Sequence, residues 1–159
     1  MINQLKLFRR QALVLLTHSM ALPLLKLIRK KKLFPYTAAE LWQMPVGTVG
    51  KDLVQMLNKE QLRLQPYYEK HDIKHVLLGY PTNEEGEVCL QCFMLGNGHI
   101  SFPVLATILF GLATMPEYYA PFKKAFLKGR RSTNITQWNW FQLLPLQTTH
   151  LQKIIFSQP

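Results

Sequence analysis

Two histidines one helical turn apart, His71 and His75, are the residues whose type and spacing best suit metal chemistry. A helix predicted from Pro66 to Leu78 places both imidazoles on one side, because residues i and i+4 face the same way in a helix. Two imidazoles placed in this way can bind one ion, as they do on zinc-binding helices. Asp72 follows the first histidine directly and is a candidate third ligand, or the group that orients the ring of His75.

Glu87 is the candidate ligand from the next predicted helix. The preference of acidic side chains for the first turn of a helix accounts for Glu84 and Glu85, whereas Glu87 is expected to lie beyond that turn. Gly86 costs roughly 1 kcal/mol relative to alanine inside a helix, which indicates that another backbone or a ligand comes close there. One interpretation of these residues is therefore a single divalent ion between two central helices, for which mixed nitrogen and oxygen ligands allow zinc, manganese or iron.

Cys89 and Cys92 offer a rival ligand set, in which both cysteines and both histidines hold a structural zinc ion. Viewed along the helix, Cys89 is turned by about 200° and Cys92 by about 140° from Glu87, so only one of these faces can meet the histidines. The histidine–cysteine spacing matches no common zinc-finger pattern, which favours the carboxylate. Two cysteines form no disulfide framework in a chain of this size and indicate small core side chains in a reducing compartment.

A pair of surface histidines beside a charged turn is the third interpretation of the same residues. It would be favoured for an isolated pair. However, five of the nine acidic residues of the chain fall between Glu69 and Glu87. This local concentration of acids leaves the metal site and the surface pair evenly balanced.

Helical periodicity dominates the elements that must position these residues. It predicts an all-α fold, a bundle of roughly seven or eight helices that forms a single domain over residues 1–159. Residues 1–35 are expected to form basic amphipathic helices, and residues 36–159 the core. Residues 102–115 are almost wholly apolar and are predicted to be a helix that belongs to the core or lines an apolar pocket.

Local signals mark where the helices should begin and end. Thr37 with Glu40, and Thr82 with Glu85, have the form of capping boxes. Thr48 is expected to cap a helix that runs over residues 49–62. Gly79 is expected to close the histidine helix, since Pro81 prevents its continuation. Pro145 is predicted to divide the last segment into two short helices.

The chain is strongly basic, with 19 Lys and Arg against 9 Asp and Glu and a formal net charge of +10. The cations gather at residues 9–10, 26–32 and 123–131, each time beside an apolar segment. Nucleic acid is not expected as a partner, because no binding motif is present and basic and aromatic residues are little interleaved. An anionic membrane surface is expected instead. No segment has the roughly 20 uninterrupted apolar residues of a spanning helix, so peripheral association is predicted.

The full stretch around the histidines resembles a known family. The pattern is H-D-x-x-H, eleven residues and then E, together with LLGYPT, GE and LQCFMLG. It resembles the signature of the coenzyme Q (ubiquinone) biosynthesis protein four family. Upstream, PVGTVGKDLVQML is similar to the family's helix start, and downstream NW, LPL and LQKII are similar to its closing segment. The resemblance covers roughly residues 40–155.

The resemblance implies an all-helical, membrane-associated protein of the ubiquinone pathway, whose motif binds a divalent metal, with zinc as the first choice. By position, the ligand set carries over to His71, Asp72, His75 and Glu87. The family is associated with loss of the ring carboxylate from a polyprenylated hydroxybenzoate, with hydroxylation at carbon one, and with scaffolding of the other quinone-biosynthesis enzymes. The lack of an organelle presequence fits a bacterial-type member on the cytoplasmic side of the membrane.

Three functions follow from these observations. The first is a metal-dependent decarboxylase, a lyase, in which Asp72 is the candidate catalytic residue for proton transfer. The second is a non-catalytic scaffold that binds a prenylated aromatic or isoprenoid lipid around a structural metal. The third is a basic helical adaptor without metal. No Ser-His-Asp or Cys-His nucleophile is evident, so the enzymatic hypothesis depends on the metal. A homodimer is allowed in each case.

Overall fold

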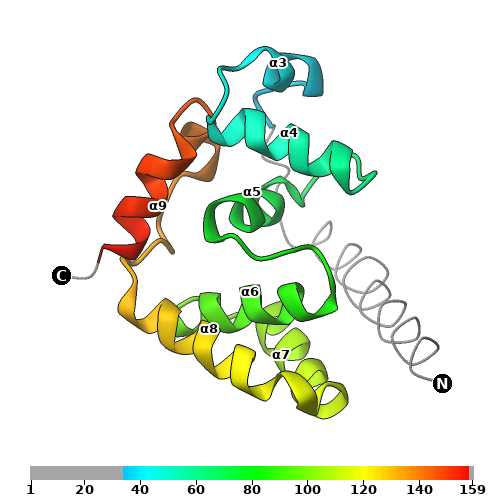
Figure 1. Ribbon diagram of the computed structural model, residues 1–159, viewed down its shortest axis with the longest axis vertical. Coiled ribbons are helices and arrows are strands. Elements are labelled where there is room, and N and C mark those ends of the chain that lie inside the picture. Colours follow the sequence, from blue (N-terminus) through cyan, green and yellow to red (C-terminus); the bar gives the residue numbers. More distant parts are fainter. Residues whose placement is uncertain (1–33, 158–159) are drawn as a thin grey trace. The chain divides into compact units, whose positions relative to one another are not determined.

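The computed structural model describes residues 34–157, which form seven α-helices and two short 3-10 helices (Figure 1). These are α3 (Ala38–Gln43), α4 (Val49–Lys59), α5 (Glu69–Leu78), α6 (Glu84–Gly96), α7 (Phe102–Thr114), η2 (Pro116–Tyr118), α8 (Tyr119–Arg131), η3 (Trp140–Leu143) and α9 (Thr148–Phe156). Within this range the only β pairing is an isolated bridge between Thr48 and Gln147. The predicted all-α fold is therefore confirmed. The amphipathic helices predicted near the N-terminus fall almost wholly outside the described residues.

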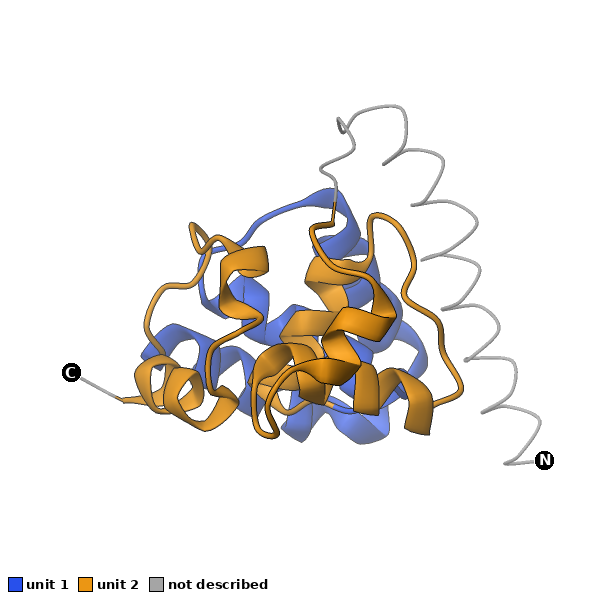
Figure 2. Cartoon of the chain, turned by 90° about the horizontal axis from the view of Figure 1, so that it is seen from above, with its two compact units in different colours: residues 1–30, 81–131 blue, residues 31–80, 132–159 orange. Residues whose placement is uncertain are grey.

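The described chain divides into two compact units, coloured separately in Figure 2. The described part of one unit is continuous and comprises residues 81–131, with α6, α7, η2 and α8. The other is discontinuous and joins residues 34–80 to residues 132–157, so that α3, α4 and α5 share it with η3 and α9. The single domain expected from the sequence stays a prediction.

In the continuous unit, α6 packs against both α7 and α8. The crossing with α8 is close because both helices carry glycine there. A Cβ atom added at Gly129 would lie 2.1 Å from the carbonyl oxygen of Phe93, and one at Gly96 would lie 2.1 Å from that of Phe126. The side-chain amide of Asn97 donates to the carbonyl of Gly129 across 3.1 Å. Small residues thus let the two backbones touch.

In the discontinuous unit, the segment before α9 is tied to the start of α4. The amide of Val49 donates to the carbonyl of Leu146 at 2.9 Å, and the hydroxyl of Thr148 donates to the carboxylate of Asp52 at 2.6 Å. Helix α5 packs against α4, η3 and α9. The ammonium groups of Lys70 and Lys74 lie over aromatic rings of residues 141 and 140, at 5.6 and 5.3 Å from the ring centroids. These contacts fix α5, the helix that carries both histidines.

The predicted helix boundaries hold at some positions and fail at others. Thr37 and Glu40 form the capping box, and Thr48 caps α4. The capping box predicted at Thr82 is wrong, because Asn83 is the N-cap of α6 and its side chain accepts from the amide of Gly86 at 2.8 Å. Asparagine is as good an N-cap as threonine, so a one-residue shift was available to the chain.

Helix α4 ends at Lys59, before the predicted boundary at residue 62. Gln61 has a φ of 55°, which a helix cannot accommodate, so the helix must stop before it. In the last segment, the short helix before Pro145 is the 3-10 helix η3, and the one after it is α9. Over residues 34–157, none of the helices is long and apolar enough to cross a membrane.

Candidate metal centre

Helix α5 begins later than the sequence indicates. The predicted start at Pro66 is wrong, since Tyr67 has a φ of 76° and the helix begins at Glu69. Its end is as predicted. Gly79 takes the left-handed conformation, with a φ of 72°, and its amide donates to the carbonyl of His75. This turn directs the chain back past the last turn of the helix.

That return places a backbone carbonyl against His75. The His75 side chain is 2% exposed, and its Nδ1 lies 2.9 Å from the carbonyl oxygen of Tyr80. Because a carbonyl only accepts hydrogen bonds, we assign the proton to Nδ1. In the neutral ring, Nε2 then carries the lone pair that can bind a ligand or accept a hydrogen bond. The Tyr80 carbonyl was not among the predicted site groups, and the helix-ending Gly79, one residue earlier, is the only signal of it in the sequence.

The lone pair of His75 faces the other histidine. The Nε2 atoms of His75 and His71 are 3.1 Å apart, and the rings meet edge to face with centroids 4.7 Å apart. Two imidazole nitrogens at about 2.0–2.1 Å from a tetrahedral zinc ion would lie about 3.3 Å apart. The spacing observed between the two rings therefore fits a pair of ligands to one ion. It also fits a hydrogen bond donated by His71.

Glu87 lies in the first turn of α6, together with Glu84 and Glu85. The expectation that it lies beyond that turn is therefore wrong, and the helix dipole favours all three acids alike. The close approach predicted at Gly86 is confirmed. A Cβ atom there would lie 1.9 Å from the carbonyl oxygen of Pro81. Glycine at this position lets the turn before α6 fold tightly onto the helix.

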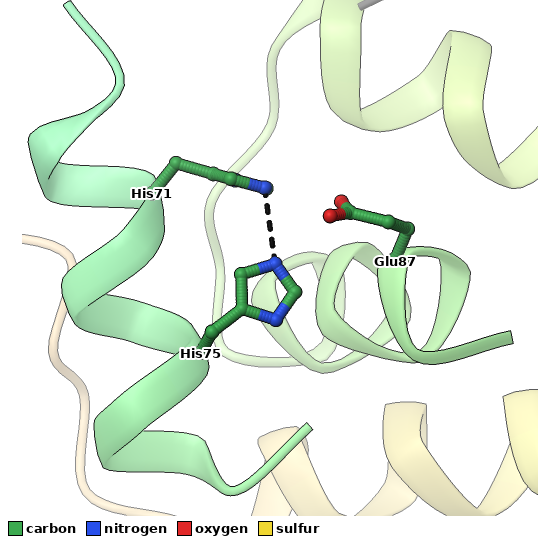
Figure 3. Close-up of side chains that lie close together, drawn as sticks. All are labelled: His71, His75 and Glu87. Carbon is green, nitrogen blue, oxygen red and sulfur yellow. Dashed lines mark hydrogen bonds between the residues drawn. The ribbon is translucent and has the colours of Figure 1, made fainter. Parts of the chain in front are cut away.

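Among the described residues, His71, His75 and Glu87 form the one group of three or more potential metal ligands. One ligand atom from each lies within 4.8 Å of the others (Figure 3). His75 is buried, while His71 and Glu87 are half-buried. Asp72 is half-buried and is not a member of this group, so its role as fourth ligand stays a prediction. The Nδ1 atom of His75 bonds to the Tyr80 carbonyl, and the expectation that Asp72 orients this ring stays a prediction.

The cysteines are small core residues, as predicted. Cys89 and Cys92 are each 5% exposed and form no disulfide. Burial, with a smaller contribution from Glu85, raises the pKa of Cys89 to about 11. Burial, with a smaller contribution from Cys89, raises the pKa of Cys92 to about 12. Neither cysteine belongs to the group of described residues whose ligand atoms gather around the two histidines, which argues against the rival histidine–cysteine site.

Comparisons with known proteins cover the part of the chain that contains this centre. The sequence model described as coenzyme Q (ubiquinone) biosynthesis protein Coq4 matches residues 54–155, a range that includes all four candidate ligands. The mitochondrial ubiquinone biosynthesis protein COQ4 of Yarrowia lipolytica is 28% identical over 139 residues, covering 72% of this chain and 52% of that protein. The chain thus spans about half the length of the curated relative that it matches.

One solved structure resembles the whole fold. It is the crystal structure of a Nostoc punctiforme protein provisionally described as a ubiquinone biosynthesis protein. Its TM-score is 0.62 at 19% sequence identity, and the superposition covers 96% of this chain and 81% of that one. At this level of identity, the likeness shows a shared fold.

Proposed function

Because this chain belongs to the coenzyme Q (ubiquinone) biosynthesis protein Coq4 family, which places it in ubiquinone biosynthesis, we propose a specific role for it there. The chain binds a polyprenylated hydroxybenzoate and promotes loss of the ring carboxylate at a divalent-metal centre. His71, His75 and Glu87 hold the ion, with zinc as the first choice, and Asp72 is a fourth ligand or the proton-transfer group. It does so at the membrane surface, alongside other enzymes of quinone biosynthesis.

The hydrogen bond from His75 Nδ1 to the Tyr80 carbonyl is the observation that carries this proposal. It leaves Nε2, the nitrogen nearest His71, as a lone-pair donor in a buried place. Metal-binding histidines usually donate their other ring proton to a carbonyl or carboxylate, which fixes the ring and raises its basicity. A surface histidine pair has no need of such a bond.

The chemistry requires negative charge to develop on the ring as its bond to the carboxylate breaks. A divalent ion at these ligands would supply a Lewis acid that stabilises this charge. Of the chain's own groups, the buried imidazole of His75 helps exclude water. Asp72, half-buried on the same helix, would move the proton if it is not itself a ligand.

Metal content provides the first test of this proposal. His75→Ala should abolish stoichiometric metal, measured by elemental analysis of the purified chain, and Glu87→Gln should weaken binding. Cys89→Ser is the matched control and should retain the metal. If His75→Ala keeps its metal while Cys89→Ser loses it, the ligand set is wrong.

Turnover provides the second test. The metal-loaded chain is incubated with a short-chain prenylated hydroxybenzoate under dioxygen. If hydroxyl from water replaces the carboxylate, dioxygen takes up the two electrons and is reduced to hydrogen peroxide. Release of carbon dioxide and formation of the hydroxylated ring should occur, and His71→Ala should lack both. Turnover that survives in His71→Ala would contradict the enzymatic role. Tight binding without turnover would support the scaffold that organises other quinone-biosynthesis enzymes.

A further inference from the structure

Helix α7 has an apolar side chain on nearly every face, yet only one face is buried. Val104, Thr107, Ile108 and Gly111 point into the protein, and Gly111 lies against Val88 of α6. The opposite face carries large apolar side chains that remain exposed: Phe102, Leu105, Leu109 and Leu112. We call these four residues the α7 stripe. The most prominent leucine, Leu109, is 65% exposed.

The stripe is continuous along the helix axis. Its members are spaced three, four and three residues apart, which keeps them on one side of a helix with 3.6 residues per turn. No charged residue occurs between Phe102 and Thr114, so no charge interrupts the apolar stripe. A contiguous exposed apolar face of this kind marks an interaction surface.

The neighbouring helix supplies charge of one sign. Helix α8 contains five exposed cations and no acidic residue: Lys123, Lys124, Lys128, Arg130 and Arg131. The hydroxyl of Tyr119, in the first turn of α8, donates to the carbonyl of Leu112 at 2.7 Å. Tyr119 thus connects the end of the α7 stripe to α8, and Lys123 follows it one turn later on the same side.

We propose that the α7 stripe and the adjoining basic side of α8 form the surface by which this protein docks on an anionic lipid bilayer. The stripe would enter the boundary between headgroups and acyl chains, and Lys123 and Arg130 would lie at the level of the anionic headgroups. The positive charge of α8 favours an anionic bilayer as the partner of this surface. A second copy of the chain would bring the same five cations to the interface and be repelled by them. The inference rests on the proposed membrane association and not on the metal centre.

Binding of full-length variants to phosphatidylcholine vesicles with rising phosphatidylglycerol content tests this docking surface. Leu109→Glu should weaken binding roughly tenfold or more, because it places a charge in the apolar boundary. Leu62→Glu is the matched control, since Leu62 is also an exposed leucine, 47% accessible and just beyond α4. Lys123→Gln should weaken binding about fivefold, while Lys59→Gln on α4 should not.

A fluorescent label reports where the bilayer makes contact. In Leu109→Cys, an environment-sensitive dye can be attached selectively at neutral pH, because Cys89 and Cys92 are buried with raised pKa values. Its emission should shift to the blue on anionic vesicles, whereas a label at Leu62→Cys should not respond. An unresponsive label at position 109 on vesicle-bound protein would overturn the proposal.

Two other results would also overturn it. A label at position 109 that is shielded without lipid, and more so at higher protein concentration, would identify a second copy as the occupant. Shielding without lipid at every concentration would identify another segment of this chain. Metal content separates this inference from the proposed function. Leu109→Glu should keep its full metal complement even if vesicle binding is lost, whereas loss of metal in His75→Ala should leave vesicle binding intact.

Discussion

The two ring nitrogens of His75 have different partners, an arrangement that is typical of metal-binding histidines. A single backbone carbonyl, that of Tyr80, holds Nδ1, and the other nitrogen faces His71. The carbonyl is in place because Gly79 adopts a left-handed conformation at the end of α5. The backbone conformation of Gly79 therefore determines which group bonds to the ring of His75.

The two buried thiols should make the free energy of unfolding depend on pH. Folding raises the pKa of Cys89 to about 11 and of Cys92 to about 12, from an ordinary value of 9.0. A thiol with a raised pKa contributes stability that is fully present below pH 9 and is lost as the pH rises through its folded pKa. The free energy of unfolding should fall above pH 9 by at most about 1.4 kcal/mol per pH unit for each thiol.

Urea unfolding at a series of alkaline pH values measures this fall. Tyrosine and lysine residues titrate in the same range, so the comparison is between the wild type and Cys92→Ala. The variant should lose less stability between pH 9 and 11 than the wild type does. If the free energy of unfolding fell equally steeply with pH in both proteins, the effect could not be assigned to the buried thiols.

The turn between α5 and α6 depends on two glycines with different roles. Gly79 supplies a positive φ, and a Cβ atom there would meet nothing within 4 Å. Gly86 has no unusual φ, but a Cβ atom added there would collide with the Pro81 carbonyl. The first position is restricted by backbone conformation and the second by space.

The two alanine substitutions should therefore differ in cost. Gly79→Ala should lower the free energy of unfolding by about 1–2 kcal/mol, the cost of a left-handed L-residue, and Gly79→Asn should recover part of it. Gly86→Ala should cost about 1–3 kcal/mol, although alanine is the better helix former, and asparagine should not rescue that position. Urea unfolding measures each cost. A Gly86→Ala variant as stable as the wild type would show that the Pro81 carbonyl yields freely.

Ligand binding links the metal centre to the stability of the whole molecule. An ion that binds only the folded chain stabilises it by mass action, by about 2.7 kcal/mol at a free concentration one hundred times its Kd. Adding zinc to the metal-free chain should raise the midpoint of thermal unfolding, and a chelator should reverse this. His71→Ala should show neither effect. A shift of equal size in that variant would indicate binding elsewhere, for example at the cysteines.

The amino-acid sequence alone was enough to predict the class of fold and the pairing of the two histidines on one helix. Helical periodicity does not depend on tertiary contacts, so the all-α fold could be read directly from the chain. Spacing on one helix also suffices to put His71 beside His75. The cap at Thr37 and the helix end at Gly79 depend on interactions within a few residues, and both were predicted correctly.

Tertiary structure decided what depends on residues distant in sequence or on backbone conformation. Positive φ values at Gln61 and Tyr67 moved two helix boundaries, since neither residue type signals such a conformation. Cap choice between Thr82 and Asn83 is energetically close, so packing of the Pro81 turn could settle it. The apolar run at residues 102–115 predicted a helix but not its environment. Only the packing of α6 against α7, where Gly111 lies against Val88, determined which face is core, and so left Leu109 on the surface.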